Sequence, residues 1–353
     1  MVARGVETAV FSLNPVLKEE GGAFCGYKVF VPGSITGGIS SKSLLRKVSY
    51  LFYIAELKRV IRDFRPNIIH AHYASSYGTL GALSGFLPLF ISLWGSDIYD
   101  FPRRNFIARA IVKYNLSAAT LILSTSNTMA KEAGRYTGKE IRTLPFGIDL
   151  EKFRALPQSD QKQPGEIVTG TVKALEREYG IDILIRSFAK VCERNPDQKI
   201  RLKIAGGGSL EKQLKDLATA TGFGNRIEFA GRLNHHEIPS FLRQLDIFVA
   251  LSVSESFGVS VIEASACELP VVVSDAGGLP EVVDNGITGI IVPVGDVEQA
   301  AAAIGKMVND AELRVRLGAN GRKKVEKMYN WRHNVDEMVA IYARYESIAI
   351  SVK

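Results

Sequence analysis

Two glutamates flank an expected strand-to-helix turn in the second half of the chain. The apolar run 246–251 predicts a strand, followed by a loop that holds Glu255 and a helix that holds Glu263. The first amides of such a helix have no partner within the helix and attract phosphate groups. The stretch therefore predicts a site for a phosphate-bearing substrate. Its donors would be the amides of Ser256, Phe257, Gly258 and Val259.

Cations or glycines also follow other expected strands of this half. They are Lys173 after 167–172, Gly206 and Gly207 after 200–205, Arg232 after 227–230 and Gly277 with Gly278 after 271–274. Taken singly, each is explained by a solvated charge or a turn, and Glu263 by a favourable helix dipole in a first helical turn. Together they favour one site, because the carboxyl ends of parallel strands share the edge where open α/β sheets bind ligands.

Strand-like apolar runs alternate with helical patterns along the chain, which predicts an α/β fold of two doubly wound parallel-sheet, Rossmann-like domains. The expected strands are 28–31, 68–71, 89–94, 121–124 and 141–144, then 167–172, 200–205, 227–230, 247–251, 271–274 and 289–292. A polar stretch at 156–165 separates the two series. We expect domains at 1–155 and 156–330, and a helix over 331–353 that packs back on the first domain.

The first domain lacks a strand at its beginning. A doubly wound domain opens with a strand that runs into a glycine turn, yet Met1 already lies beside the turn-like Ala3–Glu7. That strand is central in a 3-2-1 order, so its neighbours would have unpaired edges. We expect a shortened first domain of reduced stability.

The bulk composition is that of a globular protein, with 353 residues, 46% hydrophobic and 23% charged. The sequence has no apolar run long enough for a membrane span, and its three cysteines lack metal-ligand spacing. Without a leader or a disulfide framework, a cytoplasmic location is expected. The net charge of +7 comes from residues 1–150, which hold 18 lysines and arginines against 10 aspartates and glutamates.

A basic first half suits nucleic acid, an anionic membrane face or a phosphate-bearing acceptor. The sequence has no dense basic tract or nucleic-acid-binding motif, which argues against nucleic acid. Residues 44–64 combine a helical period with lysines, arginines and aromatic side chains, a pattern that can rest on an anionic bilayer. A core-packed helix with a solvated basic face is the favoured alternative. Peripheral attachment to the inner membrane face thus stays open.

Several runs resemble family 4 (group 1) of the retaining, nucleotide-sugar-dependent glycosyltransferases of GT-B fold. Glu255 and Glu263 fit the E-x7-E pattern of that family. The other matching runs, in family order, are Arg4–Glu7, Ile69–His72, Gly95–Asp97, Pro145–Asp149, Gly170–Leu175, Gly231–Leu233, Pro270–Ser274 and Gly277–Glu281. The resemblance covers nearly the whole chain and implies two domains that face each other across a cleft.

By this resemblance, Glu255 lies near the anomeric carbon of the donor sugar and Glu263 binds the nucleotide ribose. Lys173 neutralises the diphosphate, and Gly5 closes over the phosphates from the opposite domain. The remaining donor contacts expected are Arg177, Gly206, Gly207, Arg232, Ser256, Phe257, Gly258 and Val259. His72, which follows a first-domain strand, is expected to touch substrate. The alternative, a histidine with a purely structural role, has the same weight.

Three departures from the family pattern concern the site. Lys173 is shifted by one position, and Tyr179 stands before Gly180 where a lysine is usual, so that Arg177 would have to supply the second cation. Trp94 replaces the family's histidine before a glycine, which implies a different sugar preference. Glu268 replaces a glycine at a surface turn.

The expected activity is retaining transfer of a sugar from a nucleotide-diphosphate sugar to a glycan or lipid-linked acceptor, in envelope or extracellular polysaccharide synthesis. No cofactor is expected, and without a D-x-D sequence or a ligand cluster no catalytic metal is expected either. The alternatives are a nucleotide-sugar 2-epimerase-like isomerase and a catalytically impaired, donor-binding paralogue. A dinucleotide-dependent oxidoreductase is disfavoured, because no G-x-G-x-x-G follows a strand.

Overall fold

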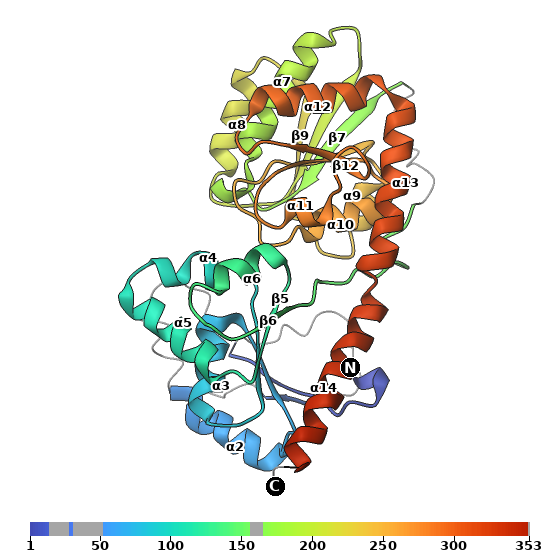
Figure 1. Cartoon of the computed structure of the whole chain (residues 1–353). Helices are drawn as coiled ribbons and strands as arrows, with labels where there is room; N and C mark the ends of the chain where they lie inside the picture. Colours follow the sequence, from blue (N-terminus) through green and yellow to red (C-terminus); the bar gives the residue numbers. More distant parts are fainter. Residues whose placement is uncertain (14–27, 31–51, 156–164, 352–353) are drawn as a thin grey trace. The chain divides into compact units, whose positions relative to one another are not determined.

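The structure is a computed structural model that describes residues 1–13, 28–30, 52–155 and 165–351 (Figure 1). The chain forms two compact units. Unit 1 comprises Met1–Leu144 with Asn334–Lys353, and unit 2 comprises Pro145–His333. The division lies before the expected boundary at 155/156, because residues 145–155 pack with unit 2. Phe153, for example, lies in its core at 1% exposure.

Unit 2 contains a six-stranded parallel sheet. Its strands are β7 Ile167–Val172, β8 Ile200–Ala205, β9 Ile227–Gly231, β10 Ile247–Ala250, β11 Val271–Ser274 and β12 Gly289–Val292, each within one residue of its predicted bounds. They lie in the order β12-β11-β10-β7-β8-β9, which is that of a doubly wound fold. The order reverses between β7 and β10, so their carboxyl ends form the edge where such sheets bind ligands.

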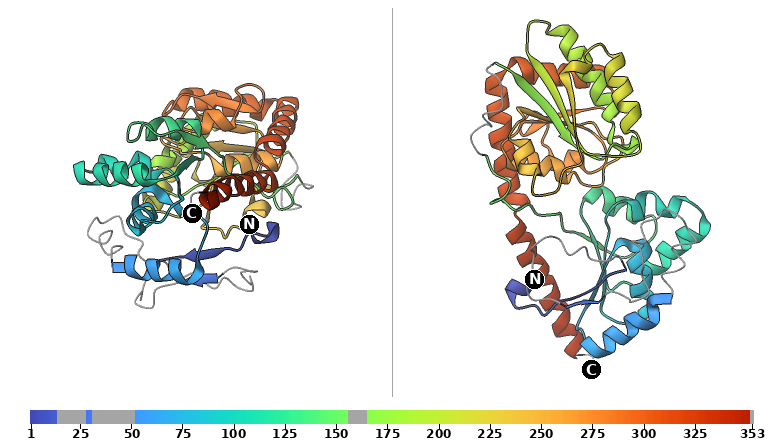
Figure 2. Two further views of the ribbon diagram at one scale, coloured as in Figure 1. Left: turned by 60° about the horizontal axis from the view of Figure 1, so that its bottom comes forward. Right: turned by 180° about the vertical axis from the view of Figure 1, so that it is seen from behind.

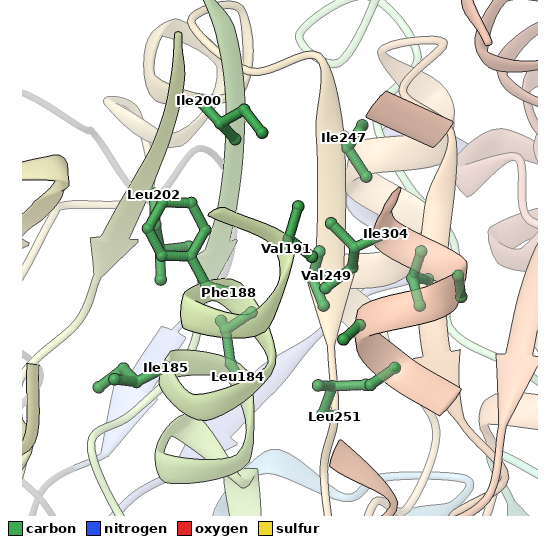
Figure 3. Packing of buried hydrophobic residues seen from close by; sticks show 14 of the residues in the cluster. Leu184, Ile185, Phe188, Val191, Ile200, Leu202, Ile247, Val249, Leu251 and Ile304 are labelled. Atoms are coloured by element: carbon green, nitrogen blue, oxygen red, sulfur yellow. The ribbon is translucent and has the colours of Figure 1, made fainter. Parts of the chain in front are cut away.

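Helices cover both faces of this sheet (Figure 1). They are α7 Ile181–Arg194, α8 Glu211–Ala220, α9 Ile238–Leu242, α10 Val259–Ala266, α11 Leu279–Val282, α12 Val297–Asn309 and α13 Ala311–Met328. On one face, α7 and α12 pack on β8 and β10, with Phe188 and Val249 fully buried (Figure 3). On the other face, residues of α9, α10 and α11 form a second core with Phe248 and Val273. Strands β10 and β11 are almost wholly apolar and fully buried because both of their faces are covered, whereas β8 and β9 carry charged residues.

In unit 1, the described strands form two separate parallel sheets. Strands β3 Ile69–His72, β4 Leu89–Ser92, β5 Leu121–Ser124 and β6 Ile141–Thr143 form one, and β1 Ala9–Phe11 pairs with β2 Lys28–Phe30 in the other. Strand β1, only three residues long, was not predicted. Within the described residues, this two-stranded sheet is not hydrogen-bonded to the four-stranded one. Val10 on β1 is 38% exposed, unlike a strand covered on both faces.

The helices of unit 1 are α2 Ile54–Phe64, α3 Gly78–Ser84, α4 Ser96–Tyr99, α5 Phe106–Ala118 and α6 Asn127–Ala133. Helix α14, Trp331–Ser351, begins at the end of unit 2 and continues in unit 1 (Figure 2). There Met338 and Ile341 pack against Phe90 of β4 and Leu123 of β5. The closing helix thus buries one face of the four-stranded sheet. Among the described residues, the structure contains no helix with the length and apolarity that a membrane crossing requires.

Candidate active site

Lys173 and Glu255 meet at the edge where the unit 2 sheet reverses its order. Lys173 follows β7 and Glu255 lies in the loop after β10, and the Lys173 ammonium forms an ion pair with Oε2 of Glu255. Both side chains are nearly buried, at 8% and 11% exposure. Ser252 donates from its hydroxyl to the same carboxylate oxygen at 3.3 Å. The sequence predicted that Lys173 and Glu255 would lie at one edge of the sheet, and the structure brings them into contact there.

Tyr179 forms part of the surroundings of Lys173. The Nζ of Lys173 lies 5.2 Å from the centroid of the Tyr179 ring, a cation–π distance. Arg177, two residues earlier in the same turn, is exposed. At the position where the family pattern calls for a second cation, this chain thus places an aromatic ring against the first.

Glycines allow the loops of this edge to approach closely. Gly206 has φ +142°, and a Cβ built on it would lie 1.8 Å from the carbonyl oxygen of Lys173. Gly277 has φ +51°, and its Cβ would lie 1.8 Å from the carbonyl oxygen of Glu255. Only glycine fits at either position, because an added Cβ would meet backbone rather than a movable side chain. These contacts fix the backbone beneath both charged residues.

Gly207 and Arg232 lie on neighbouring loops of the same edge. A Cβ built on Gly207 would be 3.8 Å from both Cβ and Nε of Arg232. The guanidinium stem therefore runs beside the glycine loop, at the ends of β8 and β9. Arg232 is exposed, so its charge faces solvent at this edge.

Helix α10 begins at Val259 with Gly258 as its N-cap in a left-handed conformation. The first amides of this helix have no carbonyl partner within it. The Phe257 side chain is buried and packs edge-on against Phe146 and Tyr329, at 5.7 Å from each ring centroid. Its side chain thus anchors the turn, and only its backbone could serve a ligand.

Glu263 lies in the second turn of α10, not in the first turn as expected, so the dipole at the helix start does not account for it. It is 4% exposed, and its Oε1 is 3.2 Å from Nε2 of His235. Burial raises the pKa of the Glu263 carboxyl. The nearby His235, and to a smaller extent Lys173, lower the pKa and so offset part of this rise. A buried carboxylate at a ligand-binding edge is a candidate for function.

His235 was missed by the sequence analysis. It follows β9 four residues after Gly231, in the same loop as Arg232, and its side chain is 67% exposed while holding Glu263. A histidine in the loop that already held Arg232, after the same strand, was the signal that could have found it. Ser252, whose hydroxyl contacts Glu255 directly after β10, was likewise not singled out in the sequence.

In unit 1, His72 belongs to an aromatic cluster at the carboxyl end of β3. Trp94 donates from Nε1 to Nδ1 of His72 at 3.2 Å, and the Trp94 ring stacks on Tyr73 with centroids 5.5 Å apart. Tyr73 has φ +78°, an uncommon conformation for a bulky residue. Trp94 and Tyr73 are each 37% exposed. The tryptophan that replaces the family's histidine therefore retains a polar contact and adds an aromatic surface.

Asp97 holds the two loops of this cluster in place. Its carboxylate is buried and accepts hydrogen bonds from the amides of Ala74, Trp94 and Gly95, at 2.7, 3.1 and 2.9 Å. It therefore joins the loop after β3 to the loop after β4. The motif Gly95–Asp97 was noted in the sequence, but this role was not predicted.

Gly5 also belongs to unit 1. It ends a single 3-10 turn with φ +78°, next to Arg4, which pairs with Asp336 of α14 at 2.6 Å. Its expected closure over the donor phosphates concerns the other unit and stays a prediction.

His70 gives unit 1 a dependence on pH. Its ring lies 2.6 Å from the Tyr342 hydroxyl and 2.7 Å from that of Ser92, and burial, with the neighbouring His72, lowers its pKa to about 3. The unfolded chain, with an ordinary histidine pKa, binds the extra proton first as the pH falls. We expect the unfolding free energy of unit 1 to be about 2 kcal/mol lower at pH 5 than at pH 7.

Trp94 fluorescence in a Trp331→Phe background would follow this unfolding in urea, because Trp94 and Trp331 are the two tryptophans of the chain. In the same background, His70→Phe should lose most of the pH dependence. His236→Gln, an exposed change in unit 2, should keep it. An unchanged slope in His70→Phe would contradict the assignment.

Two family descriptions match the chain one after the other. "Glycosyl transferase 4-like" matches residues 3–126, and "Glycosyl transferases group 1" matches residues 152–324. The chain belongs to the group 1, family 4 type of GT-B glycosyltransferases. The resemblance found in its motifs is thereby confirmed.

Two relatives of this chain are glycosyltransferases as well. It is 27% identical over 302 residues to an uncharacterized glycosyltransferase of Methanocaldococcus jannaschii, a match that covers 84% of this chain and 81% of the relative. It is 32% identical over 217 residues to the D-inositol 3-phosphate glycosyltransferase of Corynebacterium jeikeium, covering 57% of this chain and 51% of that enzyme. The second match thus spans about half of the relative's length.

Solved structures share the fold of this glycosyltransferase. A sucrose-phosphate synthase from Thermosynechococcus elongatus superposes with a TM-score of 0.86 at 21% identity, covering 98% of this chain and 91% of that one. HepE of Anabaena, in complex with UDP-glucose, superposes with a TM-score of 0.73 at 19% identity. The match covers 90% of this chain and 86% of that one. The expected pair of Rossmann-like domains is confirmed.

Proposed function

We propose that this glycosyltransferase transfers a sugar, with retention, from a nucleotide-diphosphate sugar to a glycan or lipid-linked acceptor in envelope or extracellular polysaccharide synthesis. The observation that carries the proposal is the Lys173–Glu255 pair at the switch point of the unit 2 sheet, beside the first amides of α10. A cation and the first amides of a helix suit the diphosphate, and the nearby carboxylates suit the hydroxyl groups of the sugar and the ribose. The HepE structure with UDP-glucose supports this class of donor.

In the proposed mechanism, the donor diphosphate competes with Glu255 for Lys173. The ammonium and the amides of α10 then stabilise the negative charge that develops on the leaving phosphate, with no cofactor or metal. Glu255, released from the pair, is left to contact the sugar, where positive charge develops near the anomeric carbon. Glu263 and His235 hold the ribose hydroxyls.

Retention follows if the acceptor attacks from the face that the phosphate leaves, through an oxocarbenium-like state. The C–O bond to the diphosphate breaks as the bond to the acceptor oxygen forms, and the leaving phosphate takes the acceptor proton. Atoms and charge balance without a covalent enzyme intermediate, so the proposal requires no second carboxylate as a nucleophile. The anomer of the product, read by NMR, tests this step.

A thermal-shift screen of the whole chain against nucleotide-diphosphate sugars and the matching nucleotides would test the function. A ligand that binds the folded state raises its melting temperature. Turnover of the donor found in this way, with and without acceptor glycans, then separates the candidates. Acceptor-independent formation of the 2-epimer would instead identify an isomerase, and binding without turnover an impaired paralogue.

Glu263→Ala should weaken binding of that nucleotide about 10- to 100-fold in calorimetry, because the buried carboxylate is assigned to the ribose. The kcat at saturating donor should change much less, since the contact is the same in ground and transition states. Glu312→Ala, an exposed change at the start of α13, is the matched control. Wild-type affinity in Glu263→Ala would refute the assignment.

A further inference from the structure

Helix α5 of unit 1 is apolar on two faces. Its buried face, with Val112 and Leu116 fully inaccessible, packs in the unit 1 core. On its outer face Phe106 is 81% exposed, Ile107 47% and Tyr114 51%. Residues 106 and 114, two turns apart, lie on one side of a helix. Large side chains of this kind are costly to leave in water together, and the cluster indicates a binding surface.

The charged residues on this face and in the turn just before it are all basic. Arg109 and Lys113 are exposed on α5 itself, and Arg103 and Arg104 precede it. Between Asp100 and Glu132 the sequence holds no aspartate or glutamate. Of these cations, Arg103 pairs with Glu132 at 2.8 Å, and the guanidinium of Arg109 lies 5.8 Å from the centre of the Tyr136 ring. An apolar face set among cations is complementary to an anionic surface with an apolar interior.

A depression of about 560 Å³ lies at the far end of the same helix. It is lined by Lys113, Tyr114, Ser117, Tyr136, Thr137, Gly138 and Lys139. Lys139 is anchored there, because its ammonium donates to the carbonyl oxygens of Ser117 and Ala119, at 2.5 and 2.6 Å. Two ammonium groups and several hydroxyls, with no carboxylate among the lining residues, suit a phosphate group.

We infer that the outer face of α5 (Phe106, Ile107, Arg109, Lys113 and Tyr114), with this depression, docks on an anionic phospholipid bilayer. The aromatic and aliphatic side chains would enter the boundary of the acyl chains, while the cations and the depression meet lipid phosphates. A bilayer satisfies both chemistries at once, whereas a free phosphate ion leaves Phe106 and Ile107 in water. The inference does not depend on the proposed transfer reaction.

Helix α2, the described part of the predicted membrane segment 44–64, presents no such face. Its apolar residues Leu57 and Val60 are buried, and it carries Glu56 and Asp63 beside its cations. Phe52, just before it, is exposed, but α2 itself is a core-packed helix with a solvated polar face. The structural alternative thus accounts for α2, and α5 carries the apolar, basic surface.

Co-sedimentation of the whole chain, without donor, with vesicles of phosphatidylcholine or of phosphatidylcholine and phosphatidylglycerol tests the inference. We expect at least about tenfold tighter binding to the anionic vesicles. Arg109→Gln/Lys113→Gln should lose about thirty-fold in affinity for them, from two cations near the surface. Phe106→Ser/Ile107→Ser should lose binding by a similar factor at unchanged charge.

Two variants on α13 are matched controls and should bind as the wild type. Arg316→Gln/Lys323→Gln removes two exposed cations of unit 2, and Val315→Ser removes a side chain that is 73% exposed. Melting curves would show that every variant is folded.

Equal binding to both kinds of vesicle, or anionic binding that the α5 variants leave intact, would overturn the inference. Complete loss of vesicle binding in millimolar inorganic phosphate would also overturn it. That result would mean that the depression binds a free phosphate ion rather than lipid. Self-association of the wild type that the Phe106→Ser/Ile107→Ser variant abolishes, with no vesicle binding, would assign the face to a second copy of the chain. Loss of transferase activity with vesicle binding retained would leave the inference standing.

Discussion

Glu255→Ala should lower kcat by about 10²- to 10³-fold, the scale of losing one transition-state contact in a closed site. Binding of the nucleoside diphosphate should stay the same or become tighter. The reason is the ion pair in the empty site, since Lys173 no longer has to leave a carboxylate before it meets the phosphates. Steady-state kinetics and calorimetry on the same preparation would measure both quantities. A parallel loss of nucleotide affinity would contradict the proposed competition.

The same variant should be less stable without ligand. Removing one partner of a nearly buried pair leaves the Lys173 charge uncompensated, at a cost of about 3 kcal/mol. Saturating nucleotide should restore much of this loss. Lys173→Met/Glu255→Leu, which removes both charges, should be more stable in urea than Glu255→Ala alone, yet inactive.

Gly277→Ala should abolish the site without touching a charged residue. The new Cβ would fall 1.8 Å from the carbonyl oxygen of Glu255, so the loop after β10 has to move. We expect donor binding to weaken more than about 100-fold and the unfolding free energy to fall by about 2 to 4 kcal/mol. Calorimetry with the donor and urea unfolding measure the two effects.

Gly295→Ala is the matched control for this change. Gly295 also has a positive φ, +78°, but a Cβ there meets nothing within 4 Å. It should cost only about 1 kcal/mol, from backbone strain, and bind donor normally. If both alanine variants behaved alike, the close approach at Glu255 would not be what shapes the site.

The strands of unit 2 were predictable because each is a short run rich in β-branched and other apolar residues, bounded by polar or glycine turns. Helix α10 was harder to predict. Gly258 takes up a left-handed conformation as its N-cap, which sets the helix start at Val259 and moves Glu263 into the second turn. Nothing in the residue types fixes a helix start to one residue. The short strand β1 was missed for a related reason, since three residues carry no clear period.

The meeting of Lys173 with Glu255 followed from topology, because both lie at strand ends that flank the switch point. The contacts of His235 with Glu263 and of Trp94 with His72 did not follow. They depend on the direction of single side chains within loops, which strand order does not set. The sequence thus located the edge and its charges, while the partners of each charge required the structure.

Unit 1 is assembled from two separate pieces of chain, and unit 2 is one uninterrupted piece between them. During synthesis the ribosome therefore releases all of unit 2 before Met338 and Ile341, which cover Phe90 and Leu123. The face of the unit 1 sheet that holds Phe90 and Leu123 therefore stays uncovered until all of unit 2 has been synthesised. Nascent unit 1 is then the part of this enzyme for which chaperones have the longest opportunity to bind.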